Sequence, residues 1–167
     1  MAVTDRADAD DPAFAAQVAG AGLIYLSGGN PGYLAQTLKD TLVWRAIEEA
    51  WRGGAALAGC SAGAMALTAW VPDIRRPTRP GQAGLALVPH FRVVPHFDTF
   101  QGLVPEALAR RLLRAPKGVP ILGIEEETAL VGGPEHYVVP GRQSVWLLDG
   151  GRRRLDAGAD VILRIAG

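Results

Sequence analysis

Residues 55–64, Ala-Ala-Leu-Ala-Gly-Cys-Ser-Ala-Gly-Ala, lead from a short apolar run into a segment compatible with a helix. The run Ala55–Ala58 is typical of a buried strand, and residues 64–69 favour a helix. Gly-x-Ser-x-Gly at such a strand-to-helix junction is the pattern of a nucleophile elbow, in which flanking glycines permit a sharp turn that presents the serine hydroxyl. Ser61 is therefore the predicted nucleophile, and the amide of Ala62 is a predicted donor to an oxyanion.

Two other interpretations of this motif remain open. The small residues could serve only to pack a helix closely on a strand. Cys60 is also a potential nucleophile, but it has Ala58 rather than glycine two positions before it, so the register of the elbow fits Ser61 better. A cysteine at a strand end is more typical of a small buried hydrophobic residue.

Helical and strand patterns alternate on both sides of the motif. An apolar strand over residues 22–27 runs into Gly28-Gly-Asn-Pro-Gly32, and a loop rich in Pro, Arg and Gly is expected over residues 72–84. Further helices are predicted at residues 33–39, 41–52 and 105–114. Further strands are predicted at residues 85–88, 92–95, 120–124, 128–131, 136–139, 145–148 and 161–165. This order indicates an α/β domain with a mainly parallel core sheet and an antiparallel C-terminal part.

Length and composition limit the classes of protein that need to be considered. The 167 residues provide for one domain, expected over residues 13–167, and the acidic, alanine-rich residues 1–12 are predicted to be a flexible tail. A formal net charge of zero argues against nucleic-acid binding, and no apolar run is long enough to span a membrane. No secretory signal opens the chain, which predicts a cytoplasmic protein. One cysteine excludes an internal disulfide and a multi-cysteine metal site, and we expect no cofactor or metal.

A serine nucleophile needs a base, and the chain has three histidines. His96 follows the predicted strand over residues 92–95, at a strand end where active-site residues gather. His90 lies in the same Val-Pro-His-Phe tetrapeptide one strand earlier, so it remains an alternative. His136 lies in a Gly-Pro-Glu-His turn and is expected to be solvated.

The base in turn needs a carboxylate that orients the imidazole. Glu125–Glu127 follows the predicted strand over residues 120–124, while Asp73 and Asp98 are competing acids. The Gly-rich turn at Gly28–Asn30 lacks the spacing of a phosphate-binding loop. Its amides are better suited to provide a second oxyanion donor.

Four stretches, in this order, resemble the peptidase E (α-aspartyl dipeptidase) and cyanophycinase family of serine peptidases. They are Leu26-Ser-Gly-Gly-Asn30, Gly59-Cys-Ser-Ala-Gly-Ala64, Val94-Pro-His-Phe97 and Gly123-Ile-Glu-Glu-Glu-Thr-Ala129. The resemblance extends from about residue 20 to the C-terminus. It implies a flavodoxin-like three-layer sandwich related to class I glutamine amidotransferases, with serine in place of their cysteine.

The resemblance also implies roles for individual residues. Ser61 would attack a peptide carbonyl, His96 would move the proton, and Glu126 would orient His96. The backbone amides of Gly29 and Ala62 would form the oxyanion hole. The implied activity is that of an exopeptidase or dipeptidase that forms an acyl-enzyme with short peptides.

The resemblance is less informative about the substrate. The α-aspartyl dipeptidases carry an arginine in the helix after the histidine, and Leu108 stands at that position here. We expect Asn30, Arg76 and Arg110 to bind substrate, with the loop arginines Arg75 and Arg79 as alternatives, although a displaced guanidinium loses bidentate geometry. A cyanophycinase-like or other amide hydrolase is an alternative function. A non-catalytic paralogue that binds a small ligand is another.

Family members typically begin with additional strands and helices, whereas some twenty residues precede the strand over residues 22–27 here. We therefore expect this strand to lie near a sheet edge. Exposed edges favour unwanted pairing. A homodimer that covers the edge is the corresponding prediction.

Overall fold

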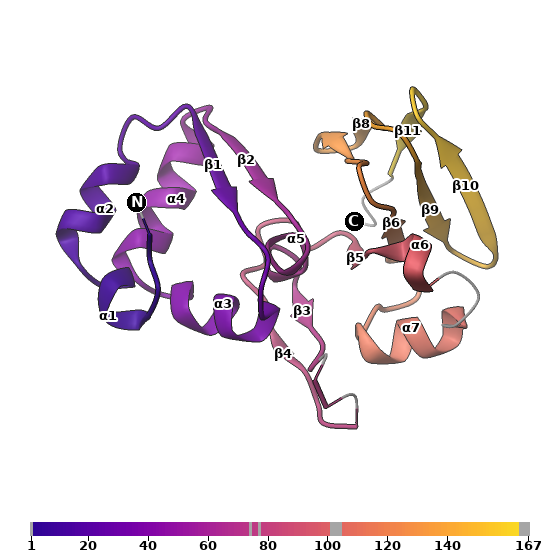
Figure 1. Ribbon diagram of the computed structural model, residues 1–167, viewed down its shortest axis with the longest axis horizontal. Coiled ribbons are helices and arrows are strands. Elements are labelled where there is room, and N and C mark those ends of the chain that lie inside the picture. The colour runs from indigo at the N-terminus through magenta and orange to yellow at the C-terminus, as the bar shows by residue number, and fades with distance from the viewer. Residues whose placement is uncertain (1, 74, 77, 101–104, 164–167) are drawn as a thin grey trace.

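The N-terminal half of the protein contains four helices and a pair of parallel strands (Figure 1). The computed structural model describes residues 2–73, 75–76, 78–100 and 105–163. Strand β1 (Leu23–Leu26) pairs in parallel with β2 (Ala56–Gly59). The helices are α1 (Arg6–Ala9), α2 (Pro12–Val18), α3 (Pro31–Leu38) and α4 (Leu42–Arg52).

Local signals explain why α4 forms where the sequence predicts it. The hydroxyl of Thr41 accepts a hydrogen bond from the amide of Trp44 at 3.2 Å and thereby caps the helix. Val43, Trp44 and Ile47 are buried on the face of α4 that packs on the N-terminal core. Gly53 follows the last helical residue, as expected for a helix stop.

The C-terminal half is built on a four-stranded mixed sheet in the order β10-β9-β6-β5. Its strands are β5 (Arg92–Pro95), β6 (Ile121–Ile124), β9 (Ser144–Leu148) and β10 (Arg152–Asp156). β5 and β6 are parallel, whereas β9 is antiparallel to both of its neighbours. A second, antiparallel sheet contains β7 (Val131–Gly132), β8 (His136–Val138) and β11 (Asp160–Ile162). Among the described residues, the four-stranded sheet is thus mixed, and parallel pairing is confined to β1–β2 and β5–β6.

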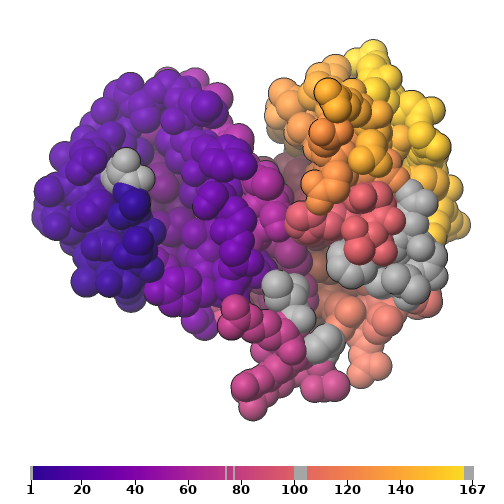
Figure 2. Space-filling view, in the orientation of Figure 1, coloured from indigo at the N-terminus to yellow at the C-terminus, as the bar shows by residue number. Residues whose placement is uncertain are grey.

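A short central helix and a projecting arm complete the fold. Helix α5 (Ala62–Ala66) contacts β2, α3 and β5, and therefore lies between the two halves (Figure 1). The arm consists of β3 (Trp70–Val71), β4 (Gln82–Ala83) and the described residues between them, 72–73, 75–76 and 78–81, and Figure 2 shows it extending away from both halves. The side-chain amide of Gln82 donates a hydrogen bond to the carbonyl of Gly32 at 2.7 Å, and this bond connects the base of the arm to α3. Beyond β5 lie α6 (Phe97–Phe100) and α7 (Glu106–Leu112).

Part of the segment over residues 1–12, for which a flexible tail is predicted, is helical within the described residues. Residues 6–9 form α1, and α2 begins at Pro12. Ala9 is fully buried, and the Arg6 guanidinium donates to the carbonyl of Gln36 at 2.8 Å. The acidic residues that suggested a solvated tail include helix caps, because the Asp5 carboxylate accepts from the amide of Asp8.

The strand predicted at residues 85–88 does not form. The amides of Leu85 and Val88 donate instead to carbonyls of Ala66 and Leu67 at the end of α5. Ala86 adopts a left-handed conformation with φ of 56°, which interrupts any extended run. Leu85 is therefore buried in the N-terminal core, with Leu87 and Val88 partly buried against it, and none of them has a strand partner.

The edge position expected for residues 22–27 agrees with the pairing of β1. Among the described residues, β1 pairs with β2 alone. Leu23 and Tyr25 leave 62% and 59% of their surfaces exposed. Within the same described ranges, no helix is long and apolar enough to cross a membrane.

Candidate active site

Ser61 stands at a tight turn between β2 and α5. Its backbone has φ of 50° and ψ of −109°, a conformation that costs free energy for a residue with a side chain and that is concentrated at functional sites. The flanking glycines are required by close packing. A Cβ added to Gly63 would lie 2.1 Å from the carbonyl oxygen of Leu26, and one added to Gly59 would lie 2.8 Å from the amide nitrogen of Ala64.

The side chains of Ser61, His96 and Glu126 form a continuous hydrogen-bonded chain. His96 follows β5, and its Nε2 lies 2.8 Å from Oγ of Ser61. Glu126 follows β6, and its carboxylate contacts Nδ1 of His96. Because β5 and β6 are parallel neighbours, their carboxyl ends bring these two residues to the same edge of the sheet. A proton on Nδ1, donated to the carboxylate, leaves Nε2 free to accept the serine proton.

The three consecutive glutamates have different environments. Glu125 is buried, and its carboxylate accepts from the amide of Ser144 at 2.9 Å and from the indole nitrogen of Trp146 at 2.8 Å. Glu127 is exposed and pairs with Arg142. The structure therefore brings Glu126, and neither of its neighbours, to the imidazole.

The competing acids lie elsewhere around the site. Asp98 accepts from the amide of Glu126 at 3.3 Å, so it contacts the backbone of this segment. Asp73 lies on the arm, where its carboxylate accepts from the amides of Arg75 and Arg76.

The other two histidines do not face Ser61. Nε2 of His90 lies 3.0 Å from the hydroxyl of Tyr137, which itself donates to the carbonyl of Pro134. Burial lowers the pKa of His90. His136 lies on the exposed part of β8. The structure thus separates the two Val-Pro-His-Phe histidines, which the residues alone left as alternatives.

Cys60 differs from its expected environment, because it is exposed rather than buried. Tyr25 of β1 lies close enough for a side-chain hydrogen bond with Cys60, which raises the pKa of the tyrosine. The cysteine and the nucleophile candidate are adjacent in sequence, but the imidazole of His96 contacts Ser61.

The backbone around Ser61 offers two amides to a reacting carbonyl. Within the described part of the chain, the amide hydrogens of Gly29 and Ala62 make no hydrogen bond. Both residues line a cavity together with Ser61 and His96. The Gly-rich turn packs beside the serine, since a Cβ at Gly28 would lie 3.6 Å from Cβ of Ser61.

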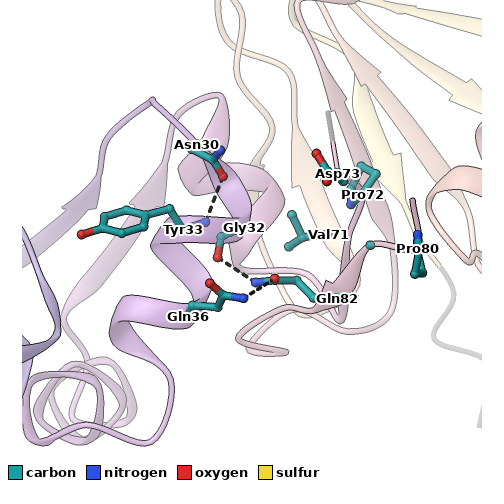
Figure 3. Close-up of a pocket in the computed structure, with 10 residues that line it drawn as sticks. Asn30, Gly32, Tyr33, Gln36, Val71, Pro72, Asp73, Pro80 and Gln82 are labelled. Carbon is teal, nitrogen blue, oxygen red and sulfur yellow. Dashed lines mark hydrogen bonds between the residues drawn. The ribbon is translucent and has the colours of Figure 1, made fainter. Parts of the chain in front are cut away.

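This cavity has a volume of about 960 Å³ and extends from Ser61 between α7 and the arm. A second, smaller cavity of about 320 Å³ is lined by residues of α3 and of the arm (Figure 3). Pro72, Asp73, Pro80 and Gly81 line both cavities, so the two meet at the arm. The larger cavity is within the range of natural small-ligand sites.

Arg110, one of the three residues expected to bind substrate, is held by contacts within the protein. The Arg110 guanidinium bonds to the carboxylates of Glu106 and Asp149, both at 2.9 Å, and to the carbonyl of Leu148. With its donors occupied, Arg110 lines neither cavity. The hydrogen bond from the amide of Gly150, together with Arg110, lowers the pKa of Glu106.

Arg76 is exposed and also lines neither cavity. Asn30 lines the smaller cavity, but its side-chain oxygen already accepts from the amide of Tyr33 at 2.9 Å and caps α3 (Figure 3).

Other arginines, of which sequence reasoning considered Arg79 alone, line the larger cavity instead. They are Arg79, Arg111 and Arg114. The spacing of residues along α7 could have suggested Arg111. Residues three apart lie on the same face of a helix, and Arg111 comes three residues after Leu108. The spacing could not show that this face borders the serine.

An α/β fold in which serine, histidine and glutamate meet at strand ends beside an open cavity is the arrangement of a serine hydrolase. The model of peptidase family S51 matches residues 6–137, and the chain therefore belongs to this family of serine peptidases. The structure is similar to that of a peptidase from an acI-B1 Actinobacterium, with a TM-score of 0.82 and 40% sequence identity. The match covers 96% of this chain and 67% of that one.

A more distant similarity extends to a protein from Listeria monocytogenes EGD-e that is provisionally assigned as a peptidase E. The TM-score is 0.59 and the sequences are 21% identical, over 84% of this chain and 67% of the other, so this similarity concerns the fold. Among curated proteins, no sequence matches significantly.

Proposed function

We propose that this peptidase cleaves short peptides, as an exopeptidase or dipeptidase, through an acyl-enzyme on Ser61. The observation that carries the proposal is the 2.8 Å contact between Oγ of Ser61 and Nε2 of His96, with Glu126 on the other ring nitrogen. A flavodoxin-like scaffold related to class I glutamine amidotransferases is part of the proposal. The volume of the cavity, which suits a ligand of a few residues, supports a small substrate.

In the proposed reaction, Oγ of Ser61 attacks the carbonyl carbon while Nε2 of His96 takes its proton. The amides of Gly29 and Ala62 donate to the negatively charged oxygen of the tetrahedral intermediate. The imidazolium then protonates the leaving amine, and the peptide C–N bond breaks to give the acyl-enzyme. A water molecule, deprotonated by His96, releases the second product and restores the serine.

Covalent labelling tests the nucleophile directly. A fluorophosphonate probe is expected to form one adduct on the native protein, located on Ser61 by peptide mass spectrometry. The Ser61→Ala variant should remain unlabelled, whereas Cys60→Ala should label like the native protein because it keeps the serine–histidine contact. Labelling that follows Cys60 would contradict the assignment.

The same samples distinguish the alternative functions. A protein that neither labels nor hydrolyses a dipeptide and tripeptide library would be a non-catalytic ligand-binding paralogue. A protein that labels but cleaves only other amides would be a different hydrolase on this scaffold, such as a cyanophycinase-like enzyme.

We also propose that a homodimer covers the exposed edge at β1. The exposure of Leu23 and Tyr25 supports this arrangement, because apolar side chains on an unpaired edge favour association. Light scattering at micromolar concentration should give the mass of two chains. A Leu23→Ser, Tyr25→Ser double variant should shift the protein toward one chain, and a native protein of monomeric mass would refute the proposal.

A further inference from the structure

The cavity beside Ser61 has a largely apolar wall. Apolar side chains converge on it from three separate elements: Met65 from α5, Trp70 from the arm, and Leu108 and Leu112 from α7. Leu108 leaves 44% of its surface exposed, although it faces this cavity. A large apolar side chain that remains wetted inside a ligand-sized cavity gains by being covered with another apolar group.

The charged groups of this cavity are less suited to select a substrate. The Arg114 guanidinium lies 4.0 Å from the centroid of the Trp70 ring, so it is stacked on that ring. Arg79 and Arg111 are both exposed, where solvent weakens their attraction for a carboxylate. Asp73 is the carboxylate that lines the cavity within the described ranges.

We propose that Leu108, with Trp70 and Leu112, forms a subsite for an apolar side chain of a residue that flanks the scissile bond. The inference rests on the proposed function, since it treats this cavity as the peptide site. Leu108 is the specificity-determining residue of the subsite. An aspartate side chain placed there would lose hydration against the apolar wall without gaining a buried cationic partner, so the enzyme should prefer apolar over acidic residues.

Paired dipeptides test this preference. The purified native chain is assayed on two series, X-Ala and Ala-X, with leucine, phenylalanine and aspartate as X. In at least one series kcat/KM for leucine or phenylalanine should exceed that for aspartate by about ten- to a hundredfold, the discrimination typical of a hydrophobic pocket. A native enzyme that prefers aspartate in both series would overturn the proposal.

A charge placed at two neighbouring positions isolates the contribution of Leu108. Leu108→Arg should lower the apolar-to-aspartate ratio at least tenfold. The matched control Ala107→Arg adds the same charge to α7 at an exposed position that does not line the cavity, and its ratio should stay within about twofold of the native value. Equal effects of the two substitutions would refute the subsite.

Binding to an inactive variant separates this inference from the proposed function. Calorimetry on Ser61→Ala measures affinity for the same dipeptides without turnover. Tighter binding of an apolar dipeptide than of its aspartate counterpart would support the subsite even if the native protein hydrolysed neither. Equal affinities, or no measurable binding of any dipeptide, would refute it, even if the native protein proved to be a peptidase.

Discussion

Substitution of His96 by asparagine is expected to lower kcat/KM by about 10⁴- to 10⁶-fold, the loss typical of removing the base from a serine-hydrolase triad. The imidazole is the group that contacts the Ser61 hydroxyl, and asparagine cannot take up its proton. Asparagine tolerates the left-handed backbone of this position, where φ is 54°. Since the side chain is 44% exposed, the free energy of unfolding should change by less than about 0.5 kcal/mol.

The other histidines provide matched controls for this measurement. His90→Asn and His136→Asn should each keep kcat/KM within a few-fold of the native value, because neither imidazole contacts Ser61. Thermal unfolding of the three variants shows whether a loss of activity reflects a loss of folding. An equal loss of activity in His90→Asn would mean that the wrong Val-Pro-His-Phe histidine has been assigned.

Much of the fold could be predicted because its signals are local. The strand over residues 92–95 has the bounds predicted, and α4 begins after the Thr41 cap and ends before Gly53. The turn at Ser61, where φ is positive, could be predicted from the glycines on both sides of it. A side chain at Gly59 or Gly63 would collide with the neighbouring backbone at this strand–helix junction. Such features depend on a few adjacent residues, and a single sequence contains them in full.

The errors arose where distant contacts override local preference. Residues 85–88 are apolar enough for a strand, but α5 provides the acceptors that their amides use. Residues 6–9 appear solvated in sequence, yet Ala9 is buried in the N-terminal core. Arg110 has the charge expected of a substrate ligand, but its guanidinium pairs with Glu106 and Asp149, and the sequence alone does not reveal these contacts.

For the active site, the sequence motifs provided several candidates for the catalytic histidine and glutamate, and the positions of the side chains in the structure reduced their number. Two histidines in the same tetrapeptide, and three consecutive glutamates, are locally equivalent. The resemblance to a known family selected His96 and Glu126, and the structure brings these two residues, rather than their neighbours, to Ser61. Their roles in catalysis stay predictions until the variants are measured.

The three consecutive glutamates give the second large effect, because one substitution should act differently at each position. Glu126→Gln should lower kcat/KM by about 10²- to 10³-fold, since an amide stabilises neither the required tautomer nor the imidazolium as a carboxylate does. This is less than the roughly 10⁴-fold loss seen at a buried triad acid. We expect the smaller loss of kcat/KM because 52% of the Glu126 side chain is exposed, and solvent screens its charge.

Glu125→Gln should instead destabilise the fold while sparing the chemistry. The buried carboxylate of Glu125 accepts hydrogen bonds from the backbone amide of Ser144 and from the indole nitrogen of Trp146. In the glutamine variant, the side-chain NH2 group would face one of these two donors, and that hydrogen bond would be lost. An unsatisfied buried group costs about 1–3 kcal/mol, and for a domain of this size each kcal/mol lowers Tm by roughly 2–4 °C. Glu127→Gln, at an exposed pair with Arg142, should change neither quantity. Measuring kcat/KM and Tm on all three variants therefore tests the register, since a uniform response would show that no single glutamate orients His96.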